Sequence, residues 1–118
     1  MKVLKMNEVP KETQVSPLFT GPVTRQSLIP DSKDLRMNIV NFGKGVKNKF
    51  HRHDGDQVLI ITGGKGIVAT EKEEKVVGVG EIVLIPAGEK HWHGAAKGSS
   101  FSHIYVQSPD SKMTQFEE

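Results

Sequence analysis

Apolar positions along the chain fall into short runs that glycine and proline separate. Residues 58–61 and 82–85 are continuous apolar runs, residues 35–42 alternate in part between apolar and polar, and residues 103–106 are strand-like in composition. Short runs rich in β-branched side chains and bounded by turn residues are typical of β-strands. The 12 glycines and 6 prolines leave little room for a long helix. The pattern therefore predicts an all-β fold, a sandwich or a barrel of short strands.

The two continuous apolar runs predict strands that are covered on both faces. In a small antiparallel protein this cover comes from a second packed sheet or from a second subunit. The pattern therefore predicts two packed sheets and favours a homodimer.

The length of the chain, 118 residues, is enough for one domain and too short for two independent cores. Residues 1–34 hold four prolines and show weak periodicity, so we expect an extended arm with one edge strand there. Residues 35–110 hold the strands of the predicted barrel. Residues 111–118 are expected to form a C-terminal tail that frays.

Charge and composition exclude several classes of protein. Lysine and arginine number 16 against 14 aspartates and glutamates, and they are scattered, so the basic patch of a nucleic-acid-binding protein is missing. No apolar run approaches the roughly 18 to 20 residues of a membrane helix, and the first residues lack the apolar segment of a signal peptide. We therefore expect a cytoplasmic protein with no nucleic-acid partner and no membrane partner.

The histidines carry the main chemical signal. In an extended strand residues i and i+2 face the same side, so His51 and His53 project together, and so do His91 and His93. Two such pairs on neighbouring strands, with His103 further along the chain, can converge on one metal ion. Neutral imidazole is the commonest metal ligand near neutral pH. Because the chain has no cysteine, the remaining ligands must be carboxylate or amide groups.

An oxygen ligand has three candidates close to the first histidine pair. Gln57 opens the apolar run 58–61, and a turn before it can bring its side-chain carbonyl back toward the histidines. Asp54 and Asp56 are rivals for this role. Because both flank a glycine, they are also typical of turn residues.

The spacing of these residues resembles the cupin family. The family has two motifs, G-x5-H-x-H-x3-E-x6-G and G-x5-P-x-G-x2-H-x3-N. Every spacing in both motifs fits this chain. Glutamine replaces the glutamate of the first motif, and Ala95 replaces the asparagine of the second. The matching residues are Gly45, His51, His53, Gln57 and Gly64 for the first motif, and Gly80, Pro86, Gly88 and His91 for the second. The resemblance implies a small jelly-roll β-barrel, often dimeric. It also implies one metal ion, held inside the barrel by His51, His53, Gln57 and His91.

A narrower resemblance links the chain to small bacterial cupins that include manganese-dependent hydroxynitrile lyases. It rests on residues 88–96, residues 18–21, Gln57 and His103. In that group the glutamine is itself a metal ligand, so the resemblance implies one divalent transition metal, manganese first, with iron, nickel and zinc as alternatives. It also implies that Thr20, with the arm folded over the mouth of the barrel, donates a hydrogen bond to the bound group.

An uncharged glutamine ligand leaves a divalent ion with its full charge, which favours Lewis-acid chemistry over redox chemistry. His93 and His103 are then the free imidazoles best placed for proton transfer at neutral pH. For His93, two alternatives stay open: it orients a metal ligand, or it is a buried strand residue. The sequence therefore predicts a metal-dependent enzyme that acts on a small hydroxy or carbonyl compound by lyase-type acid–base chemistry. Two alternatives stay open: an iron- or nickel-dependent dioxygenase, and a non-catalytic module that binds a metal or small ligand.

Overall fold

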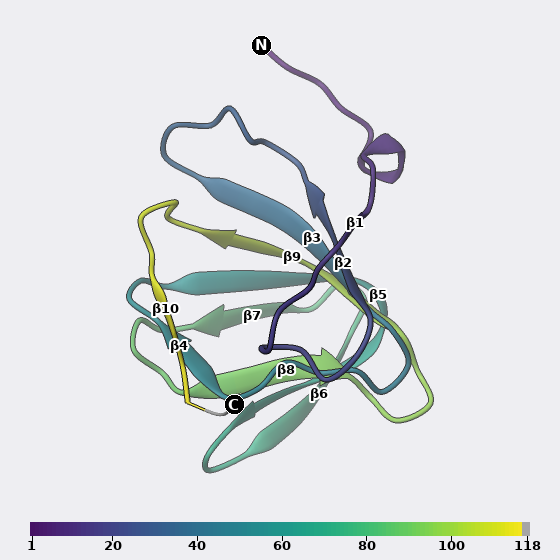
Figure 1. Ribbon diagram of the computed structural model, residues 1–118, viewed down its shortest axis with the longest axis vertical. Coiled ribbons are helices and arrows are strands. Elements are labelled where there is room, and N and C mark those ends of the chain that lie inside the picture. Colours follow the sequence, from purple (N-terminus) through teal and green to yellow (C-terminus); the bar gives the residue numbers. More distant parts are fainter. Residues whose placement is uncertain (117–118) are drawn as a thin grey trace.

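β-Strands make up nearly all of the regular structure in the computed structural model, which describes residues 1–116 (Figure 1). A short 3-10 helix, η1 (Met6–Glu8), precedes them. The strands are β1 (Glu12–Thr13), β2 (Val23–Ser27), β3 (Arg36–Phe42), β4 (His51–His53), β5 (Gln57–Thr70), β6 (Glu74–Gly78), β7 (Ile82–Ile85), β8 (His91–Ala95), β9 (Phe101–Gln107) and β10 (Met113–Gln115). Within the described residues, no helix is long and apolar enough to cross a membrane.

The longest strand, β5, belongs to two sheets and joins them. Its first part, residues 57–60, pairs with β7, and residues 58–64 pair with β9, whereas residues 65–70 pair with β6 and β8. The register against β9 shifts between Ile61 and Gly63, and such a bulge bends a strand. Gly64 follows with φ of 68°, and a Cβ there would overlap the Ser100 carbonyl. Glycine is therefore required where β5 leaves one sheet for the other.

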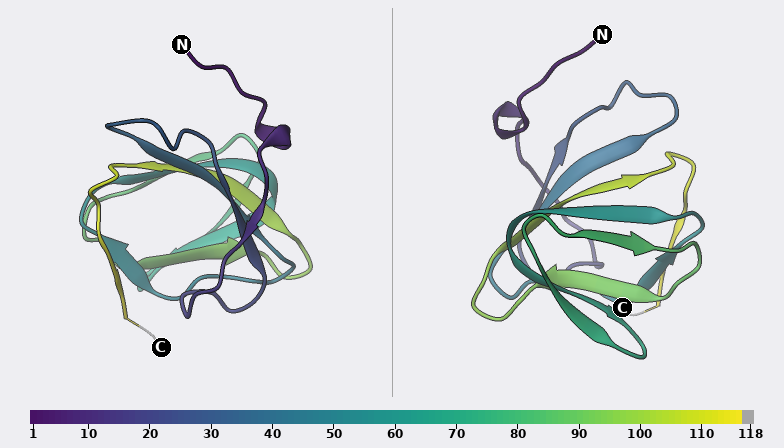
Figure 2. Two further views of the ribbon diagram at one scale, coloured as in Figure 1. Left: turned by 45° about the horizontal axis from the view of Figure 1, so that its top comes forward. Right: turned by 180° about the vertical axis from the view of Figure 1, so that it is seen from behind.

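Two curled antiparallel sheets face each other on either side of this bend (Figure 2). The first has the strand order β1-β2-β3-β9-β5-β7, and the second has the order β6-β5-β8-β4-β10. This arrangement confirms the prediction of an all-β jelly-roll barrel.

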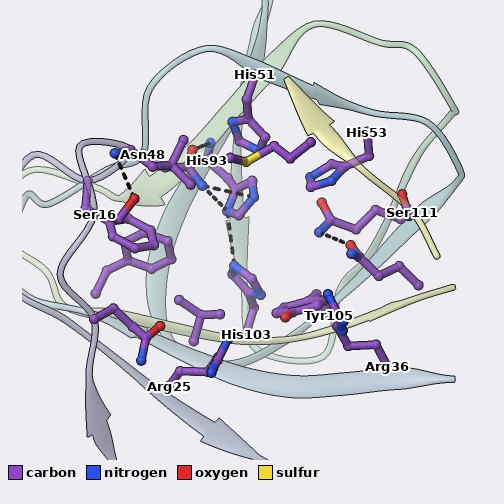
Figure 3. A pocket seen from close by; sticks show the side chains of 18 residues that line it. Ser16, Arg25, Arg36, Asn48, His51, His53, His93, His103, Tyr105 and Ser111 are labelled. Atoms are coloured by element: carbon purple, nitrogen blue, oxygen red, sulfur yellow. Dashed lines mark hydrogen bonds between the residues drawn. The ribbon is translucent and has the colours of Figure 1, made fainter. Parts of the chain in front are cut away.

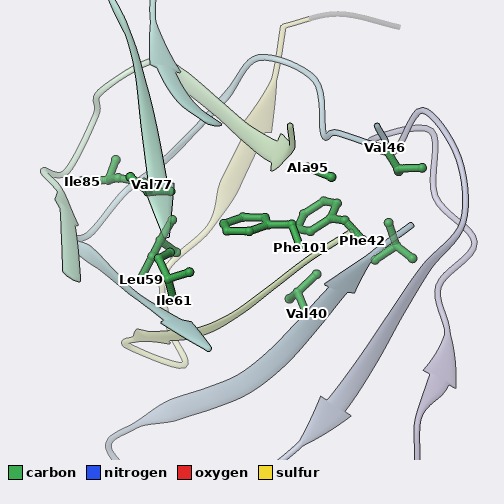
Figure 4. Close-up of a cluster of buried hydrophobic side chains, with 10 residues drawn as sticks. Val40, Phe42, Val46, Leu59, Ile61, Val77, Ile85, Ala95 and Phe101 are labelled. Atoms are coloured by element: carbon green, nitrogen blue, oxygen red, sulfur yellow. The ribbon is translucent and has the colours of Figure 1, made fainter. Parts of the chain in front are cut away.

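The main apolar core lies between the two sheets (Figure 4). Its buried members are Val23, Val40, Phe42, Val46, Leu59, Ile61, Val77, Ile85, Ala95 and Phe101. The rings of Phe42 and Phe101 stack with their centroids 5.9 Å apart. Phe42 also contacts the rings of His93 and His103. The apolar core therefore forms one wall of the polar site described below.

The N-terminal arm contributes two strands, where we expected one edge strand. β1 pairs with β2, and β2 pairs with β3 over all five of its residues. The arm also supplies Leu4 and Val9, which pack against a second buried cluster of Leu28, Ile39 and Ile104. Burial of this apolar surface fixes the arm on the barrel.

The C-terminal segment forms strand β10, which pairs with all three residues of β4. β4 is bonded to β8 only at the register pair His51 and His91, so its other edge is open to a further strand. Residues 113–115 thus differ from the fraying tail that we expected. Glu117 and Glu118, which belonged to that predicted tail, lie outside the described residues.

The outer face of β7 is exposed within the single chain. Ile82 and Leu84 have exposed fractions of 69% and 61%, although their run was expected to be covered on both faces. Cover by a second subunit would account for this pattern, and the homodimer stays a prediction.

Gly94 in β8 allows another segment of backbone to pack directly against the histidine strand. A Cβ at Gly94 would overlap the Cα of Lys47. The close approach lets the Asn48 N–H donate to the His93 carbonyl at 3.0 Å. The backbone contact therefore places the Asn48 side chain beside the histidines.

Replacing Gly94 with alanine should lower the free energy of unfolding by about 1 to 3 kcal/mol, because the added methyl group must displace packed backbone. Urea unfolding measures this change. Gly55→Ala is the matched control, since its Cβ would lie 3.7 Å from the nearest atom, Ser111 Oγ, an ordinary contact. Equal stability of the two variants would contradict the packing argument.

Candidate metal centre

All five histidines are buried and gather from three strands, β4, β8 and β9. His51 of β4 is directly opposite His91 of β8, and His103 of β9 is opposite Val40 and Ile61. Four of the five line a cavity of about 370 Å³ (Figure 3). These are His51, His53, His93 and His103. The convergence of the two His-x-His pairs follows from the register of the second sheet.

His51 and His91 are oriented by backbone carbonyls. The Nδ1–H of His51 donates to the Lys49 carbonyl at 2.6 Å, and the Nδ1–H of His91 donates to the Glu89 carbonyl at 2.8 Å. Each neutral ring therefore keeps its lone pair on Nε2, and the two ring centroids are 4.3 Å apart. This arrangement is typical of metal-binding histidines, whose second nitrogen is held by a backbone or carboxylate acceptor.

His53 and Gln57 carry buried polar atoms that have no partner. Neither ring nitrogen of His53 is hydrogen bonded. The amide nitrogen of Gln57 donates to Oε1 of Gln107 at 2.9 Å, which leaves the Gln57 carbonyl oxygen unpartnered, as is Nε2 of His91. Unpartnered buried acceptors are rare and call for an explanation. A bound metal ion would explain these unpartnered atoms. The nitrogen and oxygen donors fit a divalent transition metal.

His93 and His103 form a hydrogen-bonded pair that Asn48 orients. Asn48 Oδ1 accepts the backbone N–H of His93 at 2.8 Å, which fixes the amide, so its Nδ2 donates to His93 Nε2 at 3.2 Å. His93 therefore carries its proton on Nδ1 and donates it to His103 Nε2 at 3.0 Å. The Nδ1 of His103 has no partner.

Burial keeps all five imidazoles uncharged at neutral pH. It lowers the pKa of His51 to about 3 and the pKa values of His53 and His103 to about 4, with repulsion from His91 adding to the shift for His51 and His53. The pKa values of His91 and His93 are also lowered by burial. Neutral imidazoles have the free lone pair that a metal ion requires.

The ring nitrogens of His51, His91 and His93 lie within 4.8 Å of one another, so His93 is geometrically able to join the predicted ligands. Its two ring nitrogens, however, are engaged by Asn48 and His103. The ring nitrogens of His53 are unengaged. Hydrogen bonding therefore favours His53 over His93 as a ligand, since His93 is already paired with His103.

The other candidates lie outside the cavity. The exposed Thr20 exchanges hydrogen bonds with the backbone of Lys47, and its neighbour Phe19 lines the cavity in its place. Asp54 and Asp56 are exposed, and Asp56 accepts from the Ala87 N–H at 2.9 Å. These bonds connect the arm to the backbone of Lys47, and the hydrogen bond of Thr20 to a bound group stays a prediction.

Sequence reasoning did not single out Asn48, Arg25 or Arg36, which also line the cavity. Asn48 precedes the first histidine pair by three residues and carries no motif of its own. Arg36 has apolar neighbours, whereas Arg25 lies between Thr24 and Gln26, and only the register reveals the inner face of their strands. A charged residue on the inner side of an alternating strand is the signal that could have found them.

Comparison with known protein families matches residues 38–106 to the cupin domain, which is more than half of the chain. The chain is also 35% identical over 92 residues to an (R)-mandelonitrile lyase from Granulicella tundricola, covering 75% of this chain and 70% of that protein. The chain therefore belongs to the cupin family, as the two motifs predicted.

Other similarities are more distant. An acireductone dioxygenase from Stutzerimonas stutzeri is 31% identical over 71 residues, which are 56% of this chain and 39% of that protein. A cupin-like protein from Thermotoga maritima has a solved structure that aligns with a TM-score of 0.83 at 26% identity, covering 100% of this chain and 90% of that one. The barrel is thus shared over the whole chain.

Removal of a ligand should release the metal, whereas removal of a proton-transfer residue should not. We expect His53→Ala and Gln57→Ala to lower the bound metal per chain by about tenfold or more at limiting metal, and His93→Ala to retain it. Mass spectrometry of the metal content after dialysis measures both. Loss of metal in His93→Ala with full retention in His53→Ala would contradict the ligand set and favour the His51, His91 and His93 cluster.

Lowering the pH should destabilise the metal-free protein. The unfolded histidines have an ordinary pKa of 6.5, whereas His51, His53 and His103 have folded values of about 3 to 4. Between these values the unfolded chain binds more protons, so the free energy of unfolding falls as pH falls, by at most about 1.4 kcal/mol per pH unit for each histidine. Urea unfolding of chelator-treated protein measures the slope, and a flat profile from about pH 6.5 to 4.5 would contradict it.

Proposed function

We propose that this cupin is a metal-dependent enzyme that acts on a small hydroxy or carbonyl compound by lyase-type acid–base chemistry. One observation carries the proposal: unpartnered acceptors of His53, Gln57 and His91 lie in the same buried cluster as the paired imidazoles of His93 and His103. A metal site beside a proton acceptor is the combination that cleavage of a hydroxy compound needs.

The proposed metal ligands are His51, His53, Gln57 and His91. Manganese is the first choice, and iron, nickel and zinc are alternatives. When bound, such an ion supplies Lewis-acid polarisation of a substrate oxygen. The four donors are uncharged, because burial keeps the imidazoles neutral and Gln57 offers an amide. An uncharged donor set favours acid–base chemistry over redox chemistry.

The pair His93 and His103 is the proposed acceptor for the substrate's hydroxyl proton. His103 is uncharged near neutral pH, because burial lowers its pKa to about 4. The same burial makes the ring a weak base, and its Nε2 must exchange the hydrogen bond from His93 for the substrate proton. Asn48 holds the ring of His93, and Phe42 packs against both rings and excludes water from that side. The pair is therefore oriented before substrate arrives.

For a cyanohydrin-like substrate the proposed step balances without an oxidant. The histidine pair takes the hydroxyl proton, and the electrons of the O–H bond form the carbonyl double bond. The electron pair of the C–C bond leaves with cyanide, which then takes the proton from the histidines. The products are a carbonyl compound and hydrogen cyanide.

The similarity to a mandelonitrile lyase, which spans most of both chains, supports this reading. The shorter similarity to acireductone dioxygenases supports a second candidate, an iron- or nickel-dependent dioxygenase. The two differ in their need for oxygen.

Metal-loaded protein should therefore release carbonyl product from mandelonitrile at the same rate in air and under argon. His103→Ala should lower kcat by about 10²- to 10⁴-fold, the usual contribution of a general base, with the metal content unchanged. Product release is followed by absorbance, and metal by mass spectrometry.

His103→Gln serves as the control for packing, because it fills much of the same volume without a titratable ring. Activity of the wild-type protein that disappears under argon would favour the dioxygenase. Saturable ligand binding with no turnover would leave a non-catalytic binding module, and full activity in both variants would remove His103 from the reaction.

A further inference from the structure

The wall of the cavity opposite the metal-ligand histidines carries two arginines. Arg25 lies on β2 and Arg36 on β3, and both line the cavity. In the register of the first sheet, Arg25 is opposite Val40, which is opposite His103, whereas Arg36 is opposite Gln107. Figure 3 shows both arginines across the cavity from His51 and His53. Arg25 is half-buried, whereas Arg36 is exposed, so Arg36 faces solvent as well as the cavity.

Within the described residues, neither arginine forms an ion pair, although Glu12 of β1 is the register partner of Arg25. No aspartate or glutamate of that part of the chain lines the cavity. The Nε of Arg25 is buried and has no hydrogen-bond partner. A guanidinium group cannot lose its proton at any ordinary pH, so titration does not relieve the free-energy cost of partly burying Arg25. An anion from outside the chain would relieve it.

The other groups of the cavity leave this positive charge unopposed. The histidines are neutral, since their pKa values are lowered by burial, and Gln57 replaces the carboxylate of the family motif. The phenol oxygen of Tyr105 accepts from Asn38 Nδ2 at 2.7 Å, which leaves its O–H proton for a ligand. A divalent ion would add further positive charge. The cavity as a whole therefore attracts anions.

We propose that the cavity binds a small organic carboxylate, a 2-hydroxy or 2-oxo acid, through Arg25 and Arg36. The planar fork of arginine matches a carboxylate through two parallel hydrogen bonds. The volume of about 370 Å³ suits a molecule of this size. The acid's hydroxyl or carbonyl group would then face the histidines, an orientation that rests on the proposed function.

The test compares the binding of a carboxylate with that of the corresponding uncharged amide. Isothermal titration of the metal-free protein with sodium mandelate and with mandelamide isolates the arginines from the metal. We expect the carboxylate to bind at least about tenfold more tightly than the amide, since only the carboxylate offers the arginines a negative charge and two equivalent acceptor oxygens. Arg25→Gln and Arg36→Gln should each remove about tenfold of that affinity, and Arg36→Lys should remove less.

Lys97→Gln is the matched control, because it removes one positive charge from an exposed turn outside the cavity. It should leave the affinity unchanged, and circular dichroism should confirm that every variant is folded. Equal affinity for mandelate and mandelamide, or equal loss in the lysine control, would overturn the proposal. Tighter binding of inorganic phosphate than of mandelate would overturn the carboxylate assignment.

The two proposals can fail separately. Binding of mandelate by a protein that holds no metal would support the anion site and contradict the proposed metal-dependent enzyme. Metal binding at the histidines, together with equal affinity for mandelate and mandelamide, would support the metal site and contradict the carboxylate substrate.

Discussion

A strand that serves two sheets must bend near its middle, and β5 does so between Ile61 and Gly63. It pairs with β9 as far as Gly64, just past the bend, and with β8 from Gly66 onward. The bend therefore turns His103 of the first sheet toward His93 of the second, close enough for a 3.0 Å hydrogen bond. Without the bend, the histidines would lie along one flat sheet and could not surround a cavity.

Burying these polar side chains lowers the stability of so small a protein, because they occupy interior volume that apolar side chains would otherwise fill. Backbone carbonyls offset part of the cost by accepting from His51 and His91, and the Asn48 amide offsets part of it by donating to His93 Nε2. Other acceptors, on His53 and Gln57, have no partner in the protein. Metal binding to the folded state alone would stabilise the fold through them, so stability and site assembly are linked.

Local patterns were sufficient to predict most of the barrel and the histidine cluster. The period of two in a strand puts His51 with His53, and His91 with His93, whatever the rest of the fold does. Strand β10 escaped prediction because residues 113–115 carry little apolar signal and depend on the open edge of β4. Asn48 escaped because its position depends on a backbone contact at Gly94, far away in sequence. Both features depend on contacts between segments far apart in the sequence, which local patterns do not predict.

The glutamine at position 57 connects the metal site to the arginines. A glutamate there would place a negative charge in the cavity and would partly neutralise Arg25 and Arg36 as well as the metal. With an amide, the described lining has no anion of its own, and the positive charge is left for whatever enters. Low dielectric in the barrel strengthens that attraction compared with water. The same glutamine would therefore favour both the proposed Lewis-acid chemistry and the proposed negatively charged substrate.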